Sequence, residues 1–404
     1  MSRWWFALAL VGCGPRSGGG ASYEGETTSG IPPVADETTT TGPSSELCLA
    51  RRYSLLDDEQ CHHAAIGDLD ADGQADLAVF PGPQSFFSGS VLRRLHTFRG
   101  GATELQVPEI HCCLDVGGPA SLGLIDVNGD ARMDPLYVVN HDYVVGDVGG
   151  TMGSLDLQVR GPLGGYLPER AVAHGRLHHL RPLVAIGALA PDRPAVVVSD
   201  AEAELRVLFA DGISLEPTTS KPLMLPSNAS ALGTTDLDAD GIDDVVALLP
   251  DRLALVRSAG DGTLTLLGET TPPILGPTMI VGDLDGVGGR DIVLVGDQGI
   301  AVGLVSPDAI AWHAQPELVI TSPAVLADVD GDEALDLVTV EGTTLVAYRR
   351  GGDVTFAAAP LVVAHGVGDA VRTIVAGDLD GDARADLAVC DGLGVLVVSS
   401  GGAP

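Results

Sequence analysis

The sequence predicts an all-β fold, a seven-bladed β-propeller, on three observations. First, one aspartate-rich motif recurs along the chain with its first positions at residues 68, 126, 188, 236, 283, 328 and 378. Intervals of this size hold the four short strands of one blade. Second, each motif is followed by a short apolar run, such as Leu77–Phe80 or Val245–Leu249, which is typical of a buried strand. Third, the chain carries 53 glycines and 26 prolines, as expected for many strands joined by tight turns.

The two ends of the chain predict how the ring closes. Only 26 residues follow Asp378, which is too few for a complete blade. The segment from Leu47 to His63 precedes the first motif and is left over in the same way. If the two ends share one blade, the ring closes and no long sheet edge stays exposed. We therefore expect the propeller to span residues 47–404.

The residues before the propeller predict an export signal and a tether. Residues 1–12 carry Arg3 followed by an apolar stretch too short to span a bilayer. Leu10 to Cys13 resemble a bacterial lipobox, which implies lipidation of Cys13 and leaves an ordinary signal peptide as the alternative. Residues 13–46 are rich in Gly, Ser, Thr and Pro, which predicts a flexible linker. We expect a lipid-anchored protein of the bacterial cell envelope, at the outer membrane or cell surface.

The charge excludes several classes of partner. The chain has 55 acidic and 22 basic side chains, a formal net charge of −33. Nucleic-acid binding needs clustered Lys and Arg. The only lysine, Lys221, lies between Ser220 and Pro222, so no phosphate-binding Gly-Lys-Ser/Thr loop exists. We expect neither nucleic acid nor nucleotide among the partners.

The motifs place oxygen-bearing side chains at positions 1, 3, 5 and 9 of a nine-residue loop. We number the loops in chain order. Five are complete: Asp68, Asp70, Asp72 and Asp76 in the first; Asp126, Asn128, Asp130 and Asp134 in the second; Asp236, Asp238, Asp240 and Asp244 in the fourth; Asp328, Asp330, Asp332 and Asp336 in the sixth; Asp378, Asp380, Asp382 and Asp386 in the seventh. The fifth keeps Asp283, Asp285 and Asp291 but has Val287 at position 5, and the third, 188–196, has lost nearly all its acids.

Calcium is the ion that this pattern predicts. Ca²⁺ takes 6–8 oxygen ligands, and alternate residues of a tight loop can all point at it. Solvated Asx-turns are the alternative, but four carboxylates in one loop repel one another without a cation. An EF-hand is excluded because position 12 is never Glu. We expect about five or six structural Ca²⁺ ions, with the third and fifth loops in doubt.

The turn residues divide the complete loops into two kinds. Gly73 and Gly241 stand at position 6 of the first and fourth loops. The other three have glycine at position 4 instead, namely Gly129, Gly331 and Gly381. Glycine is favoured where the backbone is left-handed. We therefore expect slightly different turns in the two kinds of loop.

Cysteine, histidine and aromatic side chains outside the loops have roles that the sequence leaves open. Apart from Cys13, the cysteines are Cys48, Cys61, Cys112, Cys113 and Cys390, and either a Cys48–Cys61 bridge or a bridge from one of these to Cys390 is compatible with the sequence. The pairs His62-His63 and His178-His179, and His111 beside Cys112, fit no zinc motif. The long segments 77–125 and 135–187 carry aromatic side chains for a ligand surface or for the blade cores: Phe86, Phe87, Tyr137, Tyr143 and Tyr166.

The repeated loops resemble the FG-GAP/VCBS repeats of integrin-α-like propellers, over roughly residues 47–404. The segment Ile66-Gly67-Asp68-Leu69-Asp70 is close to the usual motif of that family. The resemblance implies calcium as a structural ion, and adhesion or binding of a protein or polysaccharide outside the cytoplasm. No catalytic motif appears, so we expect a binding protein. A polysaccharide lyase or hydrolase built on such a propeller, and a purely structural envelope protein, are the alternatives.

Overall fold

The computed structural model describes residues 49–399, except 54–59, 82–91, 102–104, 106–108, 116–118, 146–147, 158, 160–169, 178–182, 192, 200–202, 308, 353 and 383. All the regular structure in this part of the chain is β-strand. Correspondingly, it contains no helix of the length and apolarity that crossing a membrane requires. The predicted signal peptide (1–12) and linker (13–46), with Cys13, lie outside the described residues.

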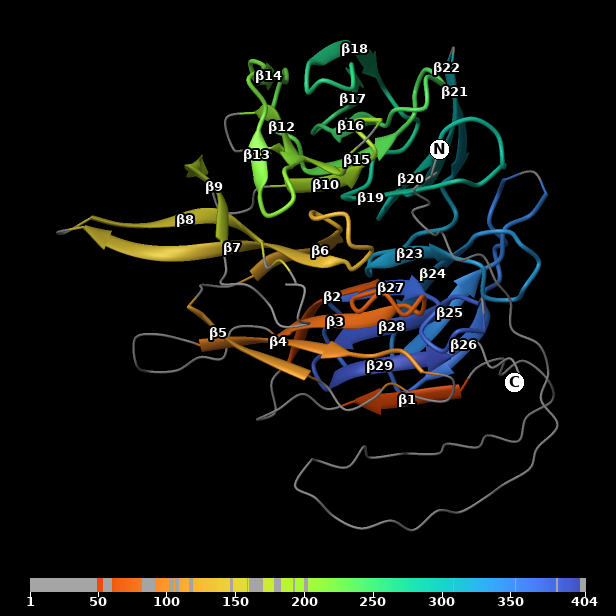
Figure 1. Cartoon of the computed structure of the whole chain (residues 1–404). Helices are drawn as coiled ribbons and strands as arrows, with labels where there is room; N and C mark the ends of the chain where they lie inside the picture. The colour runs from red at the N-terminus through yellow and green to blue at the C-terminus, as the bar shows by residue number, and fades with distance from the viewer. Residues whose placement is uncertain are drawn as a thin grey trace, which may run out of the picture.

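Seven antiparallel sheets form the blades of a ring (Figure 1). The first strands of successive blades contact one another, and β2 contacts β27 to close the circle. The blades are β2 (Cys61–Gly67), β3 (Asp76–Pro81), β4 (Leu92–Phe98) and β5 (Glu109–Asp115); β6 (Pro119–Ile125), β7 (Asp134–Val145), β8 (Val148–Leu157) and β9 (Arg170–Leu177); β10 (Leu183–Gly187), β11 (Ala195–Ser199), β12 (Glu204–Ala210) and β13 (Leu215–Pro217), with β14 (Leu223–Met224) beside β12; β15 (Ala231–Thr235), β16 (Asp244–Leu248), β17 (Leu253–Ser258) and β18 (Leu264–Thr270); β19 (Thr278–Gly282), β20 (Asp291–Gly296), β21 (Gly299–Ser306) and β22 (Ala309–Gln315); β23 (Ala324–Ala327), β24 (Asp336–Glu341), β25 (Thr344–Tyr348) and β26 (Leu361–His365); and β27 (Thr373–Gly377), β28 (Asp386–Asp391), β29 (Gly394–Ser399) and β1 (Leu49–Tyr53).

The seventh blade confirms the predicted split closure. Its outer strand β1 comes from the start of the propeller and pairs antiparallel with β29, with Arg51 opposite Val397. A disulfide joins Cys61 of the first blade to Cys390 of the seventh, across a sequence separation of 329 residues. This bridge is one of the pairings that the sequence left open, and Cys48 lies outside the described residues. Hydrogen bonds and a covalent bond therefore both hold the two ends of the ring together.

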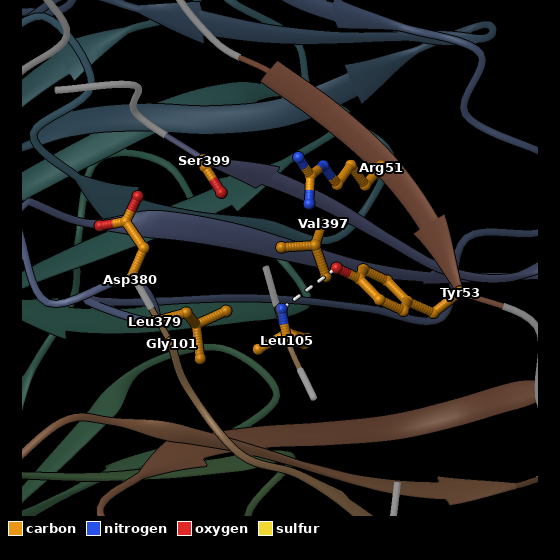
Figure 2. A pocket seen from close by; sticks show the side chains of 8 residues that line it. All are labelled: Arg51, Tyr53, Gly101, Leu105, Leu379, Asp380, Val397 and Ser399. Atoms are coloured by element: carbon orange, nitrogen blue, oxygen red, sulfur yellow. Dashed lines mark hydrogen bonds between the residues drawn. The ribbon is translucent and has the colours of Figure 1, made fainter. Parts of the chain in front are cut away.

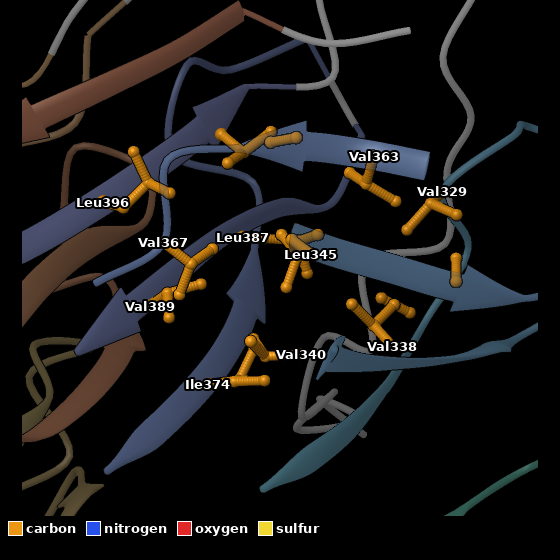
Figure 3. Close-up of a cluster of buried hydrophobic side chains, with 14 of the residues drawn as sticks. Val329, Val338, Val340, Leu345, Val363, Val367, Ile374, Leu387, Val389 and Leu396 are labelled. Atoms are coloured by element: carbon orange, nitrogen blue, oxygen red, sulfur yellow. The ribbon is translucent and has the colours of Figure 1, made fainter. Parts of the chain in front are cut away.

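Apolar side chains between neighbouring blades make up the core. In Figure 3, Val338 and Leu345 of the sixth blade pack against Leu387, Val389 and Leu396 of the seventh. The second strands are buried along their whole length in most blades, as in β16 and β28. This explains why the run after each motif is continuously apolar instead of alternating, since both faces of such a strand contact other blades.

Glycines let the first strands approach one another at the centre of the ring. A Cβ added at Gly377 would lie 2.4 Å from Cγ2 of Ile66 in the next blade, and one at Gly233 would lie 2.6 Å from Cγ2 of Val281. Four further glycines meet the next blade in the same way: Gly67, Gly123, Gly187 and Gly282. Real Cβ atoms essentially never come within 3.0 Å of such neighbours. The absence of a side chain at these positions therefore sets the spacing of the blades.

Candidate metal-binding loops

Every motif connects the first and second strands of its blade, and in all but the third motif position 9 is the first residue of the second strand. Backbone hydrogen bonds link neighbouring loops at three junctions of the ring. The position-8 N–H of one loop donates to the position-1 carbonyl of the loop before it, at 2.8 Å from Met133 to Asp68 and 2.9 Å from Asp243 to Ala188. Ala75 donates to Asp378 in the same way at 3.2 Å, which joins the first blade to the seventh. The loops therefore lie together on one face of the propeller.

The position-1 aspartate folds each loop around its own carboxylate. In the first loop, the carboxylate of Asp68 accepts hydrogen bonds from the backbone N–H groups of Ala71 at 2.7 Å and Gly73 at 3.0 Å. Asp328 accepts from Gly331 and Glu333, both at 2.8 Å. Short polar side chains stabilise turns in this way. Part of the aspartate pattern is thus explained by turn formation without any ion.

The backbone of the two kinds of loop is the same, so the expected difference in turn geometry is wrong. Positions 4 and 6 both have positive φ in the first loop, at Ala71 (63°) and Gly73 (88°). The sixth loop repeats this with the glycine exchanged, at Gly331 (85°) and Glu333 (66°). The first, second, fourth and sixth loops therefore keep glycine at one of two left-handed positions and strain an ordinary residue at the other, at about 1–2 kcal/mol.

The position-9 aspartate ties the loop to the third strand of the blade. Asp244 is fully buried and accepts hydrogen bonds from Leu237 at 3.0 Å and from Ser258 at 2.8 Å. Asp291 does the same with Leu284 and Val305. Burial raises the pKa of Asp244 and Asp291 to about 6, against the opposing effect of these N–H groups. Without an ion, the fold thus holds these carboxylates in an environment that favours the proton.

Five loops bring three carboxylates into one group, with an oxygen of each within 4.8 Å of the others. Positions 1, 3 and 9 converge in four of these loops, and positions 1, 3 and 5 in the sixth. The groups are Asp68, Asp70 and Asp76; Asp236, Asp238 and Asp244; Asp283, Asp285 and Asp291; Asp328, Asp330 and Asp332; and Asp378, Asp380 and Asp386. The fifth loop thus retains the arrangement despite exposed Val287.

The remaining predicted ligands lie outside these groups. Position-5 carboxylates instead accept the position-7 N–H, as Asp240 does from Ile242 at 2.9 Å. The others outside are Asp72, Asp336 and Asp382, with Asp126, Asn128, Asp130 and Asp134 of the second loop. In that loop Asn128 donates to Asp130 at 3.2 Å. Among the described side chains no histidine or cysteine joins a metal-binding group; those of His111, Cys112 and Cys113 are not described, and His178-His179 lie outside the described residues.

Several carboxylate oxygens in the loops have no partner. Oδ1 of Asp238, Oδ1 of Asp330 and Oδ2 of Asp336 are buried and accept no hydrogen bond. A buried carboxylate oxygen without a hydrogen bond lowers the stability of the fold. The atoms that these loops offer to a metal ion are all oxygens. Hard cations with flexible coordination, of which Ca²⁺ is the main example in proteins, suit such donors. The residues present therefore fit a calcium ion at these loops.

Sequence reasoning missed a set of arginines at the ends of the third strands. Arg99, Arg257 and Arg349 form ion pairs with the position-3 aspartates of the first, fourth and sixth loops, at 3.0, 2.8 and 3.4 Å. Each arginine directly follows the third-strand residue that pairs with motif position 10. A search at this fixed register, instead of within the motif, would have found them.

In the third loop, a side chain of the neighbouring fourth loop takes the place of the missing first aspartate. Oδ2 of Asp243, in the fourth loop, accepts the N–H of Ala188 at 2.8 Å, where a complete loop has its first aspartate. The same oxygen accepts a hydrogen bond from Arg290 of the fifth loop at 2.7 Å. Protein side chains thus bridge three loops at this point in the ring. We find no carboxylate group among the described residues of the third loop.

Of the five aromatic residues that the sequence singled out, Tyr137 is the one whose side chain the structure describes. Tyr137 is fully buried and its ring lies 5.3 Å from that of Phe80, so it belongs to the core. Phe86, Phe87 and Tyr166 lie outside the described residues, and the side chain of Tyr143 is not described. The hairpin that carries Tyr143, β7–β8, is long and projects from the ring (Figure 1).

A small pocket lies at the seam between the seventh and first blades (Figure 2). Arg51 and Tyr53 of β1 line it together with Asp380 and Ser399, and Tyr53 accepts a hydrogen bond from the N–H of Leu105 at 3.3 Å. Its cavity of about 10 Å³ is room for about one water molecule. The pocket is too small for an organic substrate.

Comparison with known proteins agrees with this architecture. Residues 328–389 match the model of the FG-GAP-like repeat. A chain in the crystal structure of BBS1N in complex with ARL6DN, soaked with mercury, is 11% identical with a TM-score of 0.56, covering 88% of this chain and 97% of that one. The corresponding lead-soaked structure gives 10% identity, a TM-score of 0.55, and 89% and 99% coverage. No curated protein matches the sequence. Residues 328–389, in the sixth and seventh blades, thus match an FG-GAP-like repeat, and the described residues as a whole form a seven-bladed β-propeller.

Proposed function

We propose that this chain is a calcium-stabilised propeller that binds a protein or polysaccharide ligand outside the cytoplasm. Propellers with FG-GAP-like repeats are typically binding domains. The observation that carries the calcium part is the convergence of three carboxylates in five loops, together with unpartnered buried oxygens at Asp238, Asp330 and Asp336. A bound ion would neutralise the repulsion within each group.

In this proposal the ion is structural, and the chain's own residues prepare its site. The position-1 aspartate sets the turn through its backbone hydrogen bonds. The position-9 aspartate joins the loop to the third strand, so an ion at the loop also fixes the blade. Because backbone hydrogen bonds join the second loop to the first, the fourth to the third and the first to the seventh, ordering one of these loops supports its neighbour. Calcium then stabilises the binding surface as a whole without contacting the ligand.

The disulfide supports a location outside the cytoplasm. Cys61 and Cys390 are paired, and structural disulfides persist mainly in oxidising compartments.

The lipobox-like sequence at Cys13 supplies an anchor to the bacterial envelope. Incorporation of radiolabelled palmitate into the wild-type protein, and its loss in Cys13→Ala, tests this part. A soluble exported Cys13→Ala with an unlabelled wild type would contradict lipidation.

The projecting β7–β8 hairpin is the first surface at which we place the ligand. It lies in the segment 135–187 that the sequence singled out, and it is the longest hairpin of the ring. A variant in which residues 140–151 are replaced by a two-residue turn should keep its melting temperature but lose binding to envelope polysaccharide or protein arrays. Unchanged binding would exclude the hairpin as the ligand-binding surface.

No feature of the described residues favours the alternative of a polysaccharide lyase or hydrolase.

Calcium titration of the metal-stripped protein by calorimetry tests the central claim. We expect uptake of about five ions and a rise of the melting temperature, because ions that bind only the folded state stabilise it. Asp238→Asn should remove about one ion. Asp251→Asn is the matched control, since Asp251 is exposed and pairs with Arg252 outside the motifs. A wild-type protein with no uptake and an unchanged melt would refute the proposal.

A further inference from the structure

We infer that Arg99, Arg257 and Arg349 are built-in counter-cations, which keep the first, fourth and sixth loops folded without calcium and leave the seventh loop, at the seam of the ring, as the calcium-dependent one. The inference rests on the proposed function, because it describes how calcium dependence is distributed among the loops. It concerns positioning residues that contact the carboxylates and not the ion.

The geometry at Asp238 separates the two roles of its carboxylate. Oδ2 is 2.8 Å from Nε of Arg257, whereas Oδ1 is buried without a partner. Asp330 repeats this division, with Oδ2 3.4 Å from Arg349 and Oδ1 buried and unpartnered. The arginine therefore occupies one oxygen and leaves the other directed at the loop. Such outer partners orient metal ligands and are part of many metal sites.

Charge explains which loops carry an arginine. The first, fourth and sixth loops have four aspartates each, and in all three the arginine pairs with position 3. Arg257 also lies 3.5 Å from position-5 Asp240, so one guanidinium serves two carboxylates. In the second loop position 3 is the neutral Asn128, and the fifth loop has lost one acid. The arginine is thus present in three of the four loops that carry four aspartates.

The seventh loop is the exception among the four-aspartate loops. The register that supplies Arg257 in the fourth blade supplies Ser399 in the seventh, where Leu387 pairs with Val398. Asp380 makes no ion pair with an arginine in the described part of the chain, although Arg51 lines the same pocket (Figure 2).

The position of this loop gives its calcium dependence a consequence for the whole ring. Its carbonyl groups at Asp378 and Leu379 accept the N–H groups of Ala75 and Gly101 in the first blade. The loop therefore holds part of the contact between the first and last blades. Loss of calcium should loosen this seam first, while the arginine-bearing loops stay ordered.

Hydrogen exchange of the full-length protein, with calcium and after metal removal, tests the inference. The N–H groups of Leu379 and Gly381, bonded to Asp386 and Asp378, should lose at least about tenfold more protection on calcium removal than those of Leu237 and Gly241 in the fourth loop. Equal loss in both loops would overturn the inference while calcium binding, measured by calorimetry, still stands.

Arg257→Met supplies the second measurement. We expect the fourth loop of this variant to lose about two- to fivefold protection without calcium and to regain it with calcium, and Arg257→Lys to retain part of it. The control is Arg206→Met, which removes an exposed arginine paired with Glu204 away from the loops. A loss in Arg257→Met that is the same with and without calcium would indicate a merely structural arginine and overturn the inference. A wild type without calcium uptake would overturn both proposals.

Discussion

Acidification should stabilise the metal-free protein and destabilise the calcium-loaded protein. The groups responsible are the position-9 aspartates. Burial raises the pKa of Asp76, Asp244 and Asp291 from 3.8 to about 6, and that of Asp336 to about 7, and neighbouring aspartates add to the effect. In the unfolded chain these carboxyls ionise near their ordinary pKa. Between about pH 4 and pH 6 the folded state therefore binds more protons than the unfolded state, and its stability falls as pH rises through the folded pKa values.

The magnitude follows from proton linkage. Three groups with a pKa of about 6 and one of about 7 give at most about 6 kcal/mol between pH 7 and pH 5, because each tenfold change in proton affinity corresponds to about 1.4 kcal/mol. Discounting roughly threefold for solvent screening leaves about 2 kcal/mol. This corresponds to several degrees in Tm. With calcium the sign reverses, because the ion binds ionised carboxylates and protons displace it.

The assay is thermal melting of metal-stripped protein in chelator-treated buffers from about pH 7.5 to about pH 5, with and without millimolar calcium. We expect Tm to rise on acidification in the first series and to fall in the second. Asp336→Asn cannot gain a proton, so its metal-free curve should be flatter near pH 7. A metal-free Tm that falls on acidification, or two parallel curves, would refute the assignment of these carboxyls as buried groups that exchange protons for an ion.

Three further predictions concern the ring itself. Gly377→Ala should lower the free energy of unfolding in urea by about 1–3 kcal/mol, because the new Cβ overlaps Ile66 across the closing seam. Ala239→Gly should raise it by about 0.5–1 kcal/mol, because Ala239 has a φ of 59°. Replacing Cys61 and Cys390 together by alanine should lower the stability by about 2–5 kcal/mol, measured against wild type under non-reducing conditions.

Each of these has a control within the chain. Gly268→Ala adds a Cβ where nothing lies within 4 Å, so it should cost little; a loss equal to that of Gly377→Ala would contradict the packing argument. Ala311→Gly removes a side chain from an exposed strand position and should destabilise, opposite to Ala239→Gly. For the disulfide, added reductant should bring wild type to the stability of the double variant. A reduced wild type as stable as the oxidised protein would show that the bridge contributes little.

The repeat pattern was sufficient to predict the fold because a propeller is built from one unit repeated in sequence. Each motif marks the turn between two strands, so the seven first positions fix the number of blades. The short remainders at the two ends predicted the shared closing blade, which β1 and β29 confirm. The aspartates could be located for the same reason, since loop positions 1, 3 and 9 are close in sequence and local turn geometry brings them together.

What the sequence could not determine depends on pairing between distant strands. The partner of Cys61 follows from ring closure, which places Cys390 beside it. Arg257 reaches Asp238 only because strand register puts the third strand next to the loop. Residue identity is local and was readable from the sequence, whereas the side chains that meet across blades and strands are decided by tertiary packing alone.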